Sequence, residues 1–121
     1  MSTRYITYIL IATGGCIGAI LRFFIDAFIP SLLGTLTVNF LGCVAMGVLM
    51  YESIYIGAFR PETRIFFGIG VIGAFTTFSA FAVQSFSAGL LIGTANILIS
   101  LAVGFAGILT GRYIISYQDG I

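Results

Sequence analysis

Hydroxyl and aromatic side chains gather at residues 73–81, which read GAFTTFSAF, inside a very apolar stretch of the chain. Thr76, Thr77 and Ser79 are neutral hydrogen-bond donors, and Gly73 before them marks a point where a helix could break. A helix interrupted within a membrane exposes carbonyls that coordinate a cation and N–H groups that face an anion. This stretch could therefore form an ion site without any charged side chain.

Two phenylalanines in the same stretch have a spacing that allows two interpretations. Phe78 and Phe81 are three residues apart, so they share one face of a helix. The edge of an aromatic ring is positive, and two edges beside hydroxyl donors would suit a small anion. The spacing alone favours ordinary packing over a ring-edge site, because the chain contains 12 phenylalanines.

Neutral polar residues recur at the same depth in two other apolar segments. Asn39 lies near the middle of the second segment and Ser100 near the middle of the fourth. A buried polar group without a partner costs a few kcal/mol, so these groups must bond to each other, to backbone, to water or to a passing ion. For Asn39, a hydrogen bond between helices is an equal alternative. Arg22, near the end of the first segment, either reaches the membrane interface or draws anions to a pore mouth.

The composition requires membrane helices to position these residues. Of the 121 residues, 60% are hydrophobic and only 7% charged, with a mean hydropathy of +1.16. Windows of about 20 apolar residues predict one all-α membrane domain, residues 1–121, with a third helix broken near Gly73–Thr77. The four predicted transmembrane helices cover about 5–24, 32–51, 65–86 and 90–114. Short connections with turn residues join them at 26–31, 52–64 and 87–89.

Other features exclude several functions. The chain has no histidine, and both cysteines lie in apolar segments without metal-ligand spacing, so a metal site of cysteine and histidine is not expected. No nucleophile has a paired base, and we do not expect an enzyme. The net charge of +1 gives no basic field for nucleic acid. Gly68, Gly70 and Gly73 spell G-x-G-x-x-G, but no strand precedes them, so helix packing explains them better.

The charged residues bear on transport and on orientation. The acidic residues, Asp26, Glu52, Glu62 and Asp119, all lie outside or at the ends of the apolar windows. A proton-coupled exporter of the small multidrug-resistance type, the main alternative, needs a carboxylate inside the membrane. Four arginines fall on the side of the termini and one on the other, which favours cytoplasmic termini.

Taken together, three stretches resemble the Fluc (CrcB-type) fluoride ion channel family over nearly the whole chain. They are Gly15-x-x-Gly18-Ala19-x-x-Arg22-Phe23, Thr35-Leu-Thr37-Val-Asn39-Phe40-x-Gly42 and Gly70-x-x-Gly73-Ala-Phe75-Thr76-Thr77-Phe78-Ser79-x-Phe81. The resemblance implies a passive, fluoride-selective channel that exports cytoplasmic fluoride and lowers its toxicity. It also implies an antiparallel, dual-topology homodimer in a bacterial inner membrane, with pores at the subunit interface.

The same resemblance assigns roles to individual residues. It implies a central sodium ion held by the backbone carbonyls of Gly73 and Thr76, and it places Arg22 in the vestibule. The implied fluoride pore is lined by Phe78, Phe81, Asn39, Ser79, Thr77 and Ser100. On the fourth segment, Asn96 and Ser100 resemble a polar track, which Gly104 interrupts. Gln84 stands where family members often carry glutamate, so the role of that acid does not carry over.

Overall fold

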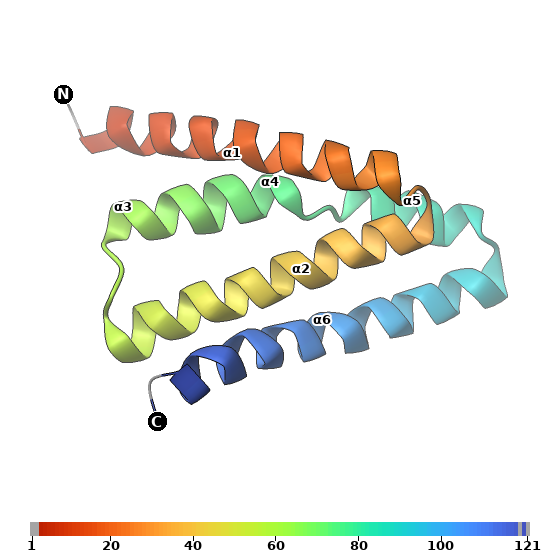
Figure 1. Cartoon of the computed structure of the whole chain (residues 1–121). Coiled ribbons are helices and arrows are strands. Elements are labelled where there is room, and N and C mark those ends of the chain that lie inside the picture. The colour runs from red at the N-terminus through yellow and green to blue at the C-terminus, as the bar shows by residue number, and fades with distance from the viewer. Residues whose placement is uncertain (1–2, 119, 121) are drawn as a thin grey trace.

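The computed structural model describes residues 3–118 and 120. Within this range the chain is all helical, without strands, and four helical spans are long and apolar enough to cross a membrane. The four predicted membrane helices are therefore confirmed. Figure 1 shows the spans side by side as an up-and-down bundle, with α2 beside α6 and α1 beside the first half of the third span.

Two of the spans are single α-helices. The first is α1, Thr3–Phe28, and the fourth is α6, Leu90–Gln118. The second span joins α2, Leu32–Tyr51, to a short π-helix η1, Glu52–Ile56. At a rise of about 1.5 Å per residue, each exceeds the roughly 20 residues needed to span the hydrocarbon core.

The third span is made of several pieces. It begins with α3, Pro61–Arg64, continues as the π-helix η2, Ile65–Ile72, and as α4, Gly73–Phe75. Residues 76–78 then leave the helical hydrogen-bond pattern, and α5 runs over Ser79–Ser87. We call residues 76–78 the interruption. Gly73 itself has helical backbone angles. The non-helical residues therefore begin at Thr76, three positions after Gly73.

Tight turns join the spans. Gly57, with φ of 69°, ends η1, and Gly89, with φ of 83°, lies between α5 and α6. Glycine adopts these left-handed angles without the steric cost that a side chain adds. The link between the second and third spans covers only residues 57–60, because much of the predicted 52–64 connection is helical. The ends of the chain and this link lie at the same end of the bundle (Figure 1).

Glycines bring the helix backbones into direct contact. A Cβ added to Gly14 of α1 would lie 2.6 Å from the Phe66 carbonyl oxygen and 3.1 Å from Gly70 Cα, both in η2. On α6, a Cβ at Gly107 would lie 2.9 Å from Cys43 Cβ of α2. Membrane helices gain little from hydrophobic burial against lipid, so such close packing supplies much of their association. These contacts hold the third span beside α1, and α6 beside α2.

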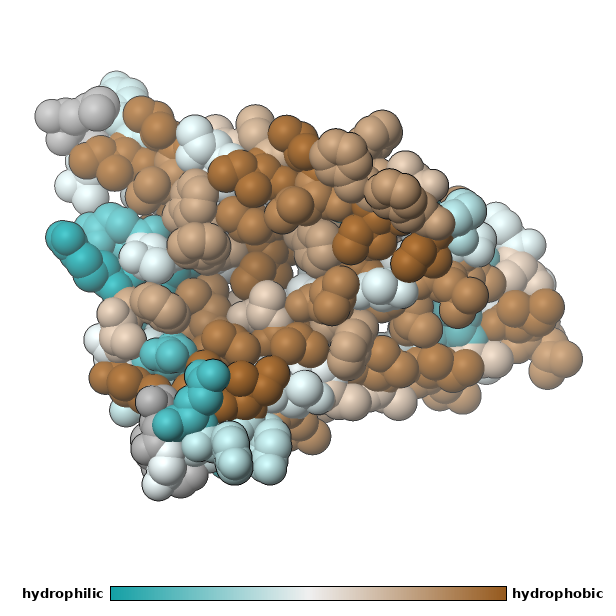
Figure 2. Space-filling model, in the orientation of Figure 1, coloured by the Kyte–Doolittle hydropathy of each residue, from teal (hydrophilic) through white to brown (hydrophobic). Residues whose placement is uncertain are grey.

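The surface is dominated by apolar side chains. Among the described residues, four hydrophobic side chains are buried, namely Val38, Leu49, Ile72 and Ile115. Figure 2 shows hydrophobic residues across the middle of the visible face, with the hydrophilic ones gathered mainly at the end that carries the chain termini. This distribution is typical of a bundle whose middle faces lipid and whose ends face water.

Candidate functional site

The interruption is formed by a change of backbone direction at Thr76. Its φ of −74° and ψ of 158° are extended, although its N–H still donates to the Ile72 carbonyl at 3.0 Å. The next N–H, that of Thr77, donates to Asn39 Oδ1 of α2 at 2.8 Å. In a continuous helix it would donate to the carbonyl four residues earlier, that of Gly73. The helical ladder therefore stops where a side chain from another helix replaces it.

The two threonine hydroxyls at the interruption are bonded locally. Thr76 Oγ1 donates to the Ile72 carbonyl at 3.0 Å. Thr77 Oγ1 accepts from the Ala80 N–H at 3.2 Å, in the manner of a cap on the first turn of α5, and lies 3.3 Å from Ser79 Oγ. These hydroxyls thus stabilise the bend, in addition to any role towards a ligand.

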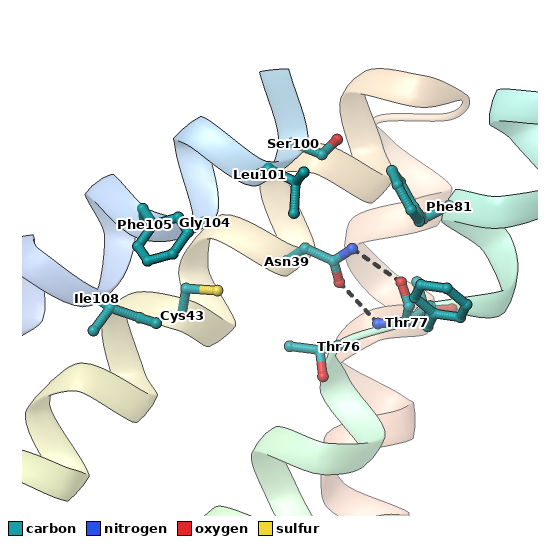
Figure 3. A pocket seen from close by; sticks show the side chains of 11 residues that line it. Asn39, Cys43, Thr76, Thr77, Phe81, Ser100, Leu101, Gly104, Phe105 and Ile108 are labelled. Carbon is teal, nitrogen blue, oxygen red and sulfur yellow. Dashed lines mark hydrogen bonds between the residues drawn. The ribbon is translucent and has the colours of Figure 1, made fainter. Parts of the chain in front are cut away.

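An open groove of about 430 Å³ lies beside the interruption, between α2, α6 and the third span. Figure 3 shows Asn39 pointing across it towards Thr77, with Ser100 and Phe81 nearby. The Ser100 hydroxyl makes no hydrogen bond to any other residue that the structure describes. All lining residues are uncharged; they are Asn39, Cys43, Thr76, Thr77, Phe78, Phe81, Ser100, Leu101, Gly104, Phe105 and Ile108.

The two predicted ring residues lie at the junction of two grooves. The centroids of Phe78 and Phe81 are 5.7 Å apart, and their planes are inclined by 50°. Both rings also line a second groove, of about 560 Å³, which runs between α5 and α6 past Ser85 and Thr94. Phe78 is 79% exposed, so it adds little to the core of a single chain. A path along both grooves would pass these two rings.

Three of the predicted site residues lie away from the grooves. Ser79 is exposed and lines neither groove. Gly73 is also exposed and lies about one turn before the interruption. Arg22 of α1 reaches the interruption from the opposite side, where Nη1 donates to the Thr76 carbonyl at a long 3.4 Å. The structure thus brings Asn39, Thr76, Thr77, Phe78, Phe81 and Ser100 together and leaves Arg22, Ser79 and Gly73 around them.

Sequence reasoning missed the apolar wall of the first groove. Cys43 lies one turn after Asn39 on α2, and Ile108 lies two turns after Ser100 on α6. Helical spacing from the two polar residues would have identified both. Asn96, one turn before Ser100, instead donates to Ser85 Oγ at 2.8 Å and links α6 to α5. Gln84 Oε1 is buried and has no hydrogen-bond partner among the described residues.

Comparison with known proteins identifies the family. Residues 9–112 match the family model described as CrcB-like protein, Camphor Resistance (CrcB). Fluoride-specific ion channel FluC 1 of Methanospirillum hungatei is 55% identical over 88% of this chain and 76% of its own length. Fluoride-specific ion channel FluC 2 of Methanosarcina barkeri is 43% identical over 92% of this chain and 88% of its own. Because the model and the relatives cover most of the chain, it belongs to the CrcB-like family, as its sequence predicts.

Proposed function

We propose that the chain forms a fluoride-selective ion channel, which exports cytoplasmic fluoride passively and so lowers its toxicity. The relatives at 55% and 43% identity are named fluoride-specific ion channels, and a channel is not an enzyme. Fluoride enters cells as the neutral acid and ionises in the cytoplasm, so a passive path for the anion is sufficient for its removal.

The first groove is the observation that carries this proposal. It offers neutral donors, the Asn39 amide and the Ser100 hydroxyl, in a wall without charged residues. Fluoride is a small, strongly hydrated acceptor, so its path must replace part of its water shell with donors. A fixed positive charge would hold the anion too firmly, whereas conduction requires binding weak enough for release. The Phe78 and Phe81 rings at the junction add positive edges along the same path.

A proton-coupled exporter of the small multidrug-resistance type is not favoured. Such an exporter needs a carboxylate that binds protons within the membrane. Neither groove is lined by an acidic residue. The relatives are also named as ion channels.

A second copy of the chain would complete the pathway. The first groove is open on one side, and lipid could not replace the water shell of an anion there. We propose an antiparallel homodimer with dual topology, in which the partner supplies the missing wall and two pores run at the interface. The highly exposed Phe78 supports this arrangement, because an interface would cover it.

A structural sodium ion at the centre of this dimer fits the residues at the interruption. Sodium prefers hard oxygen ligands, and the carbonyls of Gly73 and Thr76 are such oxygens. The helical donor to the Gly73 carbonyl, Thr77 N–H, is bonded to Asn39 instead. The Thr76 carbonyl lies in the interruption, and the long contact from Arg22 is the one hydrogen bond that it accepts from the described residues, which leaves a lone pair available. Two carbonyls from each subunit would hold the ion.

We place the protein in the cell membrane as a multi-pass protein, on the basis of its four spans. The relatives reported above come from archaea, so they support a cell membrane in general and not a bacterial inner membrane in particular. We propose that Arg22, near the end of α1, is a vestibule residue whose charge draws anions towards the channel mouth, although it lines neither groove.

Efflux from liposomes tests the proposed function. Purified protein in liposomes loaded with potassium fluoride should release fluoride down its gradient when potassium movement is allowed by an ionophore. The release, followed with a fluoride electrode, should need no pH gradient, and liposomes loaded with chloride should retain it. Release that depends on an imposed proton gradient would support an exporter and contradict the channel.

A further inference from the structure

We propose that Asn39 is a positioning residue that holds the third span open at the interruption by binding both backbone groups of Thr77. Its Oδ1 accepts from the Thr77 N–H at 2.8 Å, and its Nδ2 donates to the Thr77 carbonyl at 2.9 Å. The two residues are 38 positions apart, so the contact joins α2 to the gap between α4 and α5. Figure 3 shows both bonds as dashed lines.

The two bonds replace what the helix loses at this point. A continuous helix would use the Thr77 N–H and carbonyl in its own ladder, and the membrane interior offers little water to replace those bonds. A buried backbone group without a partner costs about 1–3 kcal/mol. Because Asn39 satisfies both groups at once, the interruption exists without an unpaired group at Thr77. The carbonyl of Gly73 is thereby released from its helical donor.

The chemistry requires an amide of this length. The end of an asparagine side chain carries an acceptor oxygen beside a nitrogen with two N–H groups, which matches the donor and acceptor of one residue's backbone. Aspartate keeps the acceptor but loses the donor when ionised, and serine is too short to span both atoms. One Nδ2 hydrogen remains after the bond to the Thr77 carbonyl. Asn39 also lines the groove, so that hydrogen is available to an anion.

Asn39 also affects the proposed ion pathway through the position of Phe78. Phe78 follows Thr77 directly, and the direction of its ring depends on the backbone that Asn39 holds. Asn39 therefore places the junction of the two grooves, in addition to contributing a donor. This inference deepens the proposed function, but the clamp itself can be measured without any ion flux.

Amide exchange at the interruption tests the clamp in the intact protein. Exchange of the segment 73–81 should be at least about tenfold faster in Asn39→Ser than in the wild type, because a protecting bond is lost. In Asn39→Asp the acceptor remains, and Thr77 N–H should stay close to wild-type protection. Equal exchange in Asn39→Ser and the wild type would contradict the clamp and leave Asn39 as a groove donor only.

Two control variants separate the clamp from other effects. Thr37→Val removes a hydroxyl on the same helix that is bonded to its own Leu33 carbonyl at 2.7 Å, and exchange at 73–81 should not change. Ser100→Ala removes a donor from the facing wall and should slow flux without altering that exchange. Faster exchange in Ser100→Ala would show that the segment responds to any change in the groove, which would contradict a specific clamp.

A measurement on the wild type covers the case in which the Asn39 variants fail to assemble. Solid-state NMR on selectively labelled protein in lipid should detect contact between Asn39 Nδ2 and the Thr77 carbonyl carbon. Absence of that contact would overturn the proposal. Protein that shows the contact but passes no fluoride would refute the proposed function and leave the clamp standing, so the two failures are distinguishable.

Discussion

The contact of α1 with η2 and the contact of α2 with the interruption hold the same span by opposite means. At the first contact, Gly14 and Gly70 have no side chains, so the two backbones pack directly against each other. At the second, Asn39 supplies a side chain that takes the place of a helical backbone bond. Small residues fix the position of a helix, whereas a polar side chain changes its hydrogen bonding. We call the small residues at helix contacts, such as Gly14 and Gly70, the frame of the bundle. They differ from Asn39, which shapes the groove proposed as the ion path.

The largest effect is expected from crowding the frame. In Gly18→Val of α1, the new Cβ would collide with the Val71 carbonyl in η2, and backbone cannot move aside cheaply. Overpacking costs about 1–3 kcal/mol or more, so little assembled protein should elute from size-exclusion chromatography in detergent. Gly15→Ala is the matched control, because its Cβ would lie 4.0 Å from Ala74 Cβ. Normal assembly of Gly18→Val would show that this contact is not tight.

A large effect on flux, without loss of assembly, is expected at the ring pair. Phe78→Ile and Phe81→Ile remove the positive ring edges at the junction of the two grooves. Fluoride efflux from liposomes should fall by more than about tenfold, which corresponds to about 1.4 kcal/mol. Phe28→Ile, at an 84% exposed site near the end of α1, should leave efflux unchanged. Wild-type efflux in both ring variants would return the pair to a packing role.

A smaller effect is expected from removing sodium. Preparation in N-methyl-D-glucamine salts should lower the fraction of dimer seen by chemical cross-linking, because the cation is too bulky for the carbonyls of Gly73 and Thr76. Adding sodium back should restore that fraction. An unchanged dimer fraction in sodium-free salts would remove the proposed ion from the interruption.

The smallest effect is expected at the facing wall. Ser100→Ala removes one neutral donor, worth about 0.5–1.5 kcal/mol, so fluoride efflux should fall by a factor of about 2 to 13. Thr110→Val is the control on the same helix, because that hydroxyl donates to its own Ala106 carbonyl at 2.7 Å. Equal efflux in the two variants would place Ser100 outside the ion path.

Much of the fold could be predicted from the sequence, because lipid imposes a simple rule on composition. Windows of apolar residues predict the four spans, and the structure confirms four helical spans long and apolar enough to cross a membrane. The helices extend past the windows, as α6 does to Gln118, because helical bonding continues after the apolar side chains end. The sequence predicts a connection over 52–64, but the link in the structure is shorter, because Glu52 begins η1 and Pro61 begins α3.

The site was less predictable, because its contacts join distant parts of the chain. Their similar depth in the membrane predicts that Asn39 and Ser100 belong to one site, and both line the first groove. The depth of a residue in the membrane does not identify its hydrogen-bond partner, however. The bonds from Asn39 to Thr77 depend on how α2 packs against the third span. The same is true of Arg22, whose contact with the Thr76 carbonyl could not be read from its place near a helix end.

Fluoride selectivity is tested by the reversal potential of the current in planar lipid bilayers that contain the purified protein. With different fluoride concentrations on the two sides, chloride added to one side and equal pH, the current should be carried by fluoride alone. Its reversal potential should shift with the fluoride concentration as expected for a fluoride electrode, and it should not respond to chloride. A reversal potential that follows the chloride gradient, or an imposed proton gradient, would contradict a fluoride-selective passive channel.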